Sequence, residues 1–212
     1  MRASTSQAWP SAFDIVAIPG ALFALAVVEL FHPHPHDLLR LDVNVWLAVR
    51  YAQIPLFALA ALAIAALVRG LSGIAPVVCR AAMFVFATSY IAFDAAAGIV
   101  IGILVEAARA SGDIGAWRMA IETIWMHPLV GATPVLALPV LAVLGSVALG
   151  IGAAAAAVAL RDSGHSWPPL ILLVVASFGI AIFRTHAWPG GPLGFGGMGV
   201  AAAWLLWEAR RG

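Results

Sequence analysis

Three of the six histidines fall close together, at His32, His34 and His36, and the prolines between them end the first apolar run of the chain. Glu29 comes three residues before His32, so a helix would present both side chains on one side. Neutral imidazole binds copper, zinc, iron and nickel, and a carboxylate can complete the coordination shell or orient a ligand from behind. This stretch predicts a transition-metal site. The prolines leave open whether the histidines alternate onto one side or fan out, so not all three are expected on one ion.

His127 and His186 are the next candidates, because each stands at the end of a predicted apolar segment. Segments that cross a membrane in alternating directions would bring both to the surface that holds His32, and would leave only His165 at the other. We therefore take His32, His36, His127 and His186 as candidate metal ligands. The alternatives are interfacial anchors for His127 and His186 and, for the His-Pro repeat, a stiff, hydrated loop among lipid headgroups.

Asp94 is an ionisable residue inside the third apolar segment. Counted from Arg80 at about 1.5 Å per residue, it lies about 21 Å into a hydrocarbon core of roughly 30 Å, on the histidine side of the midplane. A charge at that depth costs about 2.5 to 3.5 kcal/mol on insertion scales and needs a partner, a proton or water. We expect Asp94 and Glu29 to act as acid/base groups, as metal ligands or as supports of a ligand. The structural alternative for Asp94 is an ion pair with Arg50, or a protonated carboxyl hydrogen-bonded to a neighbouring hydroxyl group such as Tyr90.

Haem is a further candidate cofactor. Two facing histidines could ligate its iron, and Arg50 or Arg184 could hold a propionate. Every candidate histidine lies near a predicted membrane boundary, so haem would fit only close to the outer surface. For each arginine alone, the simpler expectation is that its alkyl chain lies along the apolar surface and its guanidinium group reaches the lipid headgroups.

The composition places the chain in a membrane. Hydrophobic residues make up 63% of the 212 residues, the mean hydropathy is +1.02, and charged residues make up 10%, against about 25% in soluble proteins. A net charge of +1 offers no basic stripe or tail for nucleic acid. The single Cys79 excludes an intrachain disulfide, a CxxC pair and a thiolate metal cage. A chain without lysine also excludes the lysine-containing phosphate loop of an ATP-driven protein.

Apolar runs long enough to cross the hydrocarbon core recur along the whole chain. They predict an all-α fold, a polytopic integral membrane bundle of about six transmembrane helices in one domain over residues 1–212. The expected spans are residues 15–31, 45–68, 81–105, 134–160 and 170–183, and a glycine-rich segment that ends at Trp207. We expect a short loop over residues 71–80 and a kink at Pro139. We expect Gly98 and Gly102, at GxxxG spacing, to serve helix packing.

Residues 106–126 form the most polar long connection between predicted spans. Apolar side chains recur there at spacings of three and four, at Ile114, Trp117, Ile121 and Trp125. That pattern is typical of an amphipathic helix in the membrane interface. We therefore expect such a helix between the third and fourth spans.

An even number of spans puts both termini on one side of the membrane. Six of the arginines would lie on that side and five on the other, a balance that slightly favours cytoplasmic termini. The eight tryptophans fall near predicted boundaries, as in the aromatic belts of membrane proteins. We expect a multi-pass protein of the cell (inner) membrane whose histidine cluster faces the extracytoplasmic side.

Three functions fit these features. The first is a membrane-bound metalloenzyme, an oxidoreductase or hydrolase that acts on a lipidic or membrane-soluble small molecule through a copper, zinc or iron site. The second is a proton-coupled transporter or channel in which Asp94 carries the proton. The third is a non-catalytic subunit of a larger membrane complex or homo-oligomer. Membrane lipids are expected partners in each case, and metal content separates the first function from the others.

Overall fold

The computed structural model describes residues 11–33, 37–131 and 138–211, and these ranges contain helices and connections but no strand. The prediction of an all-α membrane bundle is confirmed. Within the described ranges, four helical segments are long and apolar enough to cross a membrane: α1 (Ala12–Leu30), α2 (Val43–Leu67), the continuous segment Ile74–Ser111 and α6 (Val140–Asp162). The shorter α7 (Trp167–Ser177) and α8 (Gly179–Phe183) and the glycine-rich α9 (Gly190–Ala209) follow.

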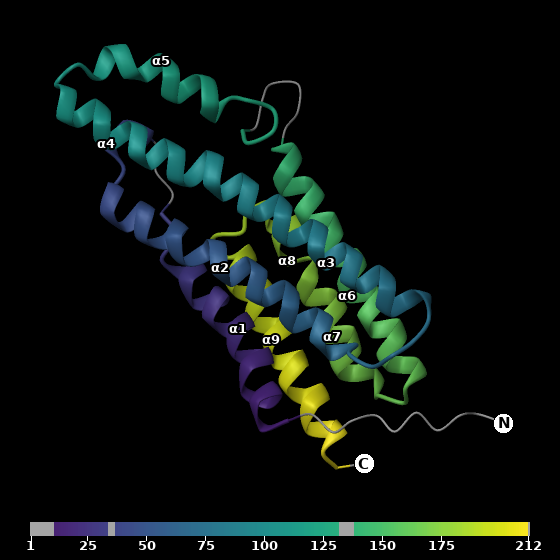
Figure 1. The fold of residues 1–212 in the computed structure, drawn as a ribbon. Helices are drawn as coiled ribbons and strands as arrows, with labels where there is room; N and C mark the ends of the chain where they lie inside the picture. The colour runs from purple at the N-terminus through teal and green to yellow at the C-terminus, as the bar shows by residue number, and fades with distance from the viewer. Residues whose placement is uncertain (1–10, 34–36, 132–137, 212) are drawn as a thin grey trace.

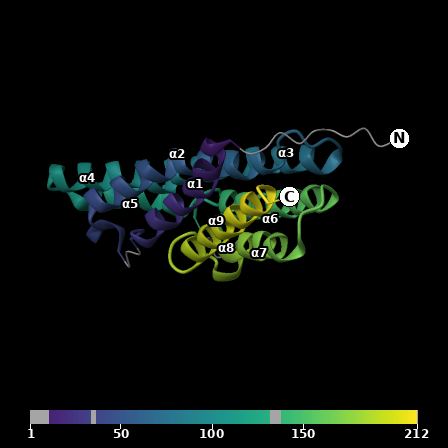
Figure 2. The ribbon, with the colours of Figure 1, turned by 90° about the horizontal axis from the view of Figure 1, so that it is seen from below.

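Six helices form a closed ring in which each contacts the next: α1, α2, α3 (Ile74–Phe93), α6, α7 and α9, which returns to α1. The start of α1 and the end of α9 lie at the same end of this ring (Figure 1). Seen from below, α2 and α3 form one layer, and α6, α7 and α9 lie across from them (Figure 2). Large side chains such as Phe57, Phe86 and Phe195 fill the interior.

The segment Ile74–Ser111 is a single long helix. It consists of α3, the π-helix η2 (Asp94–Val100) and α4 (Ile101–Ser111), 38 residues in all. At about 1.5 Å per residue it is about 57 Å long, roughly twice the thickness of a hydrocarbon core. Its far end therefore extends out of the apolar layer, together with α5 (Ile114–Trp125), which folds back along α4 (Figure 1).

The apolar stripe of α5 faces the protein. Ile121 is buried, and Trp117 and Trp125 pack with it against α4 and the start of α2. The helix expected between the third and fourth spans is therefore present, and the chain covers its apolar face except at Ile114, which is exposed. The 3₁₀ turn η1 (Leu38–Arg40) is tied to α4 by Arg109, which donates to two backbone carbonyl groups of this connection at 2.7 Å each.

Two local predictions are wrong. The loop expected over residues 71–80 is mostly helix, because α3 accommodates Pro76 in its first turn, where a missing N–H costs no hydrogen bond. Pro139 does not kink a span, because it is the N-cap residue that precedes α6.

The fifth predicted span is interrupted at Phe178, between α7 and α8. The predicted start of the fourth span, at Pro134, lies outside the described residues.

The long helix packs closely on α2 at Gly98 and Gly102. A Cβ atom at Gly98 would lie 2.5 Å from Cδ of Arg50, and one at Gly102 would lie 2.5 Å from Cδ2 of Leu47. The GxxxG spacing thus serves close packing, as expected. It also makes room for the Arg50 side chain to pass between the two helices.

Candidate metal centre

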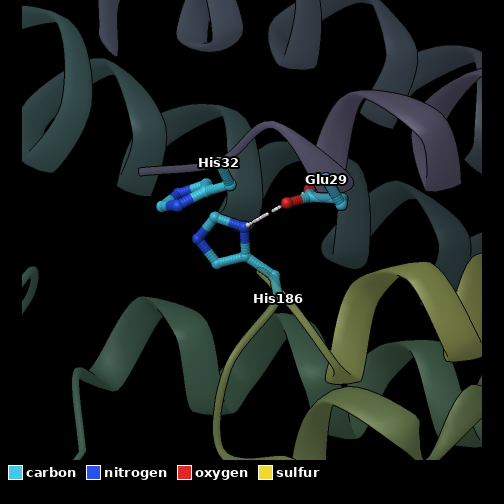
Figure 3. A group of neighbouring side chains, drawn as sticks. All are labelled: Glu29, His32 and His186. Carbon is cyan, nitrogen blue, oxygen red and sulfur yellow. Dashed lines mark hydrogen bonds and ion pairs between the residues drawn. The ribbon is translucent and has the colours of Figure 1, made fainter. Parts of the chain in front are cut away.

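Glu29, His32 and His186 come together inside one end of the ring. Glu29 is in the last turn of α1, His32 follows that helix, and His186 lies in the connection between α8 and α9. Each residue offers one ligand atom, and these atoms all lie within 4.8 Å of one another. Because α9 packs along α1, the connection that precedes α9 reaches the end of α1. Figure 3 shows the His186 ring between His32 and Glu29, with a nitrogen of His186 turned toward the Glu29 carboxylate.

Glu29 and His186 are in direct contact. The Nδ1 atom of His186 lies 3.2 Å from Oε2 and 3.3 Å from Oε1 of Glu29. Two donor atoms on a tetrahedral zinc ion are separated by roughly 3.4 Å, as Zn–N and Zn–O bonds of about 2.0 to 2.2 Å require. The rings of His32 and His186 stand edge to face, with centroids 4.7 Å apart. The separation of Glu29 and His186 therefore suits one ion, and the group as a whole, with ligand atoms up to 4.8 Å apart, would have to contract around it.

Glu29 and His32 each have a hydrogen-bonding partner outside the group that fixes the orientation of the side chain. The Nε2 atom of Gln53 donates to Oε1 of Glu29 at 2.9 Å. The Nδ1 atom of His32 lies 2.9 Å from the carbonyl oxygen of Pro33. Because a carbonyl group only accepts, this nitrogen must carry the ring hydrogen, and in a neutral ring the lone pair is then on Nε2. His32 is thus held in the tautomer that can bind a metal through Nε2.

Asp94 and Arg50 form a buried ion pair beside this group. The Nη1 atom of Arg50 donates to Oδ1 of Asp94 at 2.5 Å, and both side chains are almost completely buried. Asp94 is the first residue of the π-helix η2, a rare element that is frequent at functional sites. The same Oδ1 atom lies 3.9 Å from Nε2 of His186. The ion pair therefore joins α2 to the long helix directly against the candidate ligand.

Aromatic side chains surround His186 on the side toward the bundle core. The ring centroids of Tyr90 and Phe93 both lie 5.8 Å from that of His186, and that of Phe57 lies 6.2 Å away. Tyr90 is hydrogen-bonded to Ser146 on α6 at 2.8 Å. Such an apolar shell excludes water and lowers the local dielectric constant, which strengthens every charge interaction within it.

The charges within the group do not balance when both carboxyl groups are ionised. Glu29 and Asp94 are completely buried and carry two negative charges, whereas Arg50 supplies one positive charge. An uncompensated buried charge is strongly unfavourable. A bound cation, a protonated His186 or a protonated Glu29 would each balance it, so a cation is one of three ways to neutralise the group.

The structure brings together some of the predicted site residues and not others. Glu29, His32 and His186 meet, and Asp94 and Arg50 lie beside them, in the ion pair that was the structural alternative for Asp94. Among the described residues, His127 is exposed in the turn after α5 and is not part of the group. Arg184 is exposed at the end of α8. His36 lies outside the described residues.

Sequence reasoning placed Gln53 on the histidine side of the membrane but gave it no role in the site, and it missed Trp46. Gln53 is a polar residue inside an apolar span, three residues after Arg50, and that isolation was the available signal. Trp46 was interpreted as a membrane-boundary residue. Its indole Nε1 instead donates to the carbonyl oxygen of Gly98 at 2.7 Å, and its ring lies under the guanidinium group of Arg50 at 4.5 Å.

Two imidazoles and one carboxylate are a donor set that borderline divalent metals accept, and the described group contains no sulfur ligand. Three protein ligands leave coordination positions for water or a substrate, as in catalytic rather than structural sites. The geometry therefore provides a buried group that could hold a metal ion. No family model matches this chain, and neither a curated protein nor a solved structure matches it.

Proposed function

We propose that this protein is an integral membrane metalloprotein that binds one transition-metal ion through Glu29, His32 and His186. The observation that carries this proposal is the convergence of three ligand atoms within 4.8 Å, from segments more than 150 residues apart in the sequence. The outer hydrogen bonds to Glu29 and His32 support it, as does the negative charge that the buried group would carry with both carboxyl groups ionised.

The bound ion would serve a reaction on a lipidic or membrane-soluble substrate. Two histidines and one carboxylate with open positions are the ligands of non-haem iron oxygenases and, as His₂Glu, of zinc hydrolases. The identity of the metal therefore decides between an oxidoreductase and a hydrolase. We propose that this reaction takes place at the extracytoplasmic face of the inner membrane. This follows from the expected cytoplasmic termini, since the site lies at the end of the bundle opposite the start of α1 and the end of α9.

Metal content tests the proposal directly. We expect the purified protein, reconstituted with Zn²⁺, Fe²⁺ or Co²⁺ and freed of excess ion, to retain a stoichiometric metal by elemental analysis. His186→Ala should lose it, because one of three ligands is removed. His127→Ala is the matched control and should retain it, because that ring is exposed and lies outside the group. Full metal retention by His186→Ala, or a wild-type protein that binds none of these ions, would contradict the proposal.

Proton-coupled transport by Asp94 is a second candidate, favoured by one observation. The two nitrogens of His186 lie between two carboxylates, with Nδ1 toward Glu29 and Nε2 toward Asp94. A chain of acid, imidazole and acid is how membrane proteins pass protons. We expect proton flux into proteoliposomes to be lost in Asp94→Asn if this function is correct. Undiminished flux in that variant, or no flux in the wild type, would leave the metalloprotein as the function to pursue.

A further inference from the structure

The two nitrogens of His186 have different tasks if Glu29 and His186 share an ion. Nδ1 lies on the Glu29 side at 3.2 Å, so the ion must bind there, and Nε2 then carries the ring hydrogen. Metal-bound histidines usually donate this outer N–H to a carboxylate or a carbonyl group, which fixes the tautomer and the orientation of the ring. Asp94, whose Oδ1 is 3.9 Å from Nε2, is in place to accept it.

Asp94 has the capacity for this additional hydrogen bond. Arg50 donates to its Oδ1 atom, whereas the buried Oδ2 atom has no hydrogen-bond partner within the described ranges. A buried carboxylate oxygen without a donor is unfavourable. A shift of about 1 Å would bring the outer N–H of His186 to a hydrogen-bonding distance of about 2.9 Å from the carboxylate.

Gln53 supports Glu29 in a corresponding way, and Arg50 decides how its amide group is turned. The Nη1 atom of Arg50 lies 3.3 Å from the side-chain oxygen of Gln53. A guanidinium group only donates, so it must face that oxygen, and the NH₂ group of Gln53 is then directed at Glu29. One arginine thus orients the supports of two candidate ligands.

Arg50 is itself fixed from two sides. Its guanidinium group lies 4.5 Å from the centroid of the Trp46 ring, a cation–π contact. Its stem passes Gly98, where a Cβ atom would lie 2.5 Å from Cδ of Arg50. Trp46 donates to the carbonyl oxygen of Gly98, so both contacts belong to the same crossing of α2 and η2.

We propose that Asp94 and Gln53 are positioning residues of the metal site and that Arg50 holds both of them. Asp94 then acts through His186 and not on the substrate, and the ion keeps three protein ligands with positions open for chemistry. This inference rests on the proposed metal-binding function.

Co²⁺ binding to the full-length protein in detergent tests the proposal, with the affinity measured by competition and the ligand field by visible absorption. We expect Asp94→Asn to weaken Co²⁺ binding about 10- to 100-fold, the usual effect of losing an outer carboxylate. Its absorption bands should stay at wild-type positions, because the donor atoms do not change. Arg69→Met, which removes the ion pair with Asp14 at the other end of α2, is the matched control and should bind Co²⁺ like the wild type.

A second variant separates positioning from simple stabilisation. Arg50→Met/Asp94→Leu replaces the ion pair by apolar side chains of similar size, so the protein should fold. We expect it to bind Co²⁺ about 100-fold more weakly than the wild type. Wild-type affinity in the double variant, or shifted absorption bands in Asp94→Asn, would overturn the positioning role, the latter because Asp94 would then be a ligand. A wild-type protein that binds no Co²⁺ would instead overturn the proposed function itself.

Discussion

Gly191→Ala is expected to abolish metal binding at Glu29, His32 and His186. A Cβ atom at this position would overlap the carbonyl oxygen of His186 and would lie 2.9 Å from Cγ of Glu29. A backbone carbonyl group cannot rotate away as a flexible side chain can, so the connection that carries His186 must move. Because useful metal sites tolerate displacements of only about 0.5 Å, we expect the ligands to separate.

The same helix provides the control for this prediction. A Cβ atom at Gly196 would meet only Cβ of Ala26, at 3.9 Å, which is an ordinary contact. Gly196→Ala should therefore bind metal normally and should be unchanged or more stable by about 0.5 to 1 kcal/mol, the usual gain for alanine in a helix. Elemental analysis and thermal unfolding of both variants in the same detergent test the pair. Normal metal content in Gly191→Ala would mean that the His186 connection does not hold the site in the described geometry.

Asp94→Ala is expected to cause the largest loss of stability of any single substitution in the site. It leaves the guanidinium group of Arg50 buried without a carboxylate, and breaking a buried ion pair from one side costs about 3 to 5 kcal/mol. Much of this cost should disappear in Arg50→Met/Asp94→Leu, because no unpaired charge remains.

Unfolding free energies of the wild type, Arg50→Met, Asp94→Leu and the double variant in mixed micelles measure the effect as a double-mutant cycle. A coupling energy near zero would show that Arg50 and Asp94 do not stabilise each other, and would remove the ion pair from the description of the site. The apolar double variant is informative in both respects, because stability and metal affinity are expected to change independently.

The helical bundle could be predicted from the sequence because hydropathy alone determines which segments enter a membrane. Their ends were harder to predict. The helix Ile74–Ser111 extends beyond the predicted span 81–105 in both directions. At its start, Pro76 is tolerated because it lies in the first turn. Near its end, the charged Arg109 is accommodated because its side chain donates to the connection between α1 and α2. Length beyond the membrane leaves little trace in a hydropathy pattern.

The core of the site was also predictable, in part. Glu29 and His32 are three residues apart at the end of α1, and counting the spans brings His186 to the same end. His127 was expected to converge with them by the same counting, but the fold of the α4 and α5 hairpin decides where its turn lies, and no sequence pattern encodes that position.

The supports of the ligands depend on packing at atomic scale. Gln53 could be recognised as an isolated polar residue, but its contact with Glu29 depends on how α1 crosses α2. Gly98 lies within the π-helix that begins at Asp94, and its role depends on the Arg50 side chain that packs against it. A sequence pattern predicts which side of a helix is apolar, but it does not predict which atoms meet where two helices cross.

The closure of the ring between α1 and α9 has a consequence for biosynthesis. Glu29 and His32 leave the ribosome early, whereas His186 is 157 residues further along than Glu29 and reaches them only when α9 docks against α1. No ion can be captured by all three ligands while the chain is still being made. If the group binds a metal ion as proposed, loading must follow the docking of α9, and Glu29 must enter the membrane before any ion can be held by all three residues.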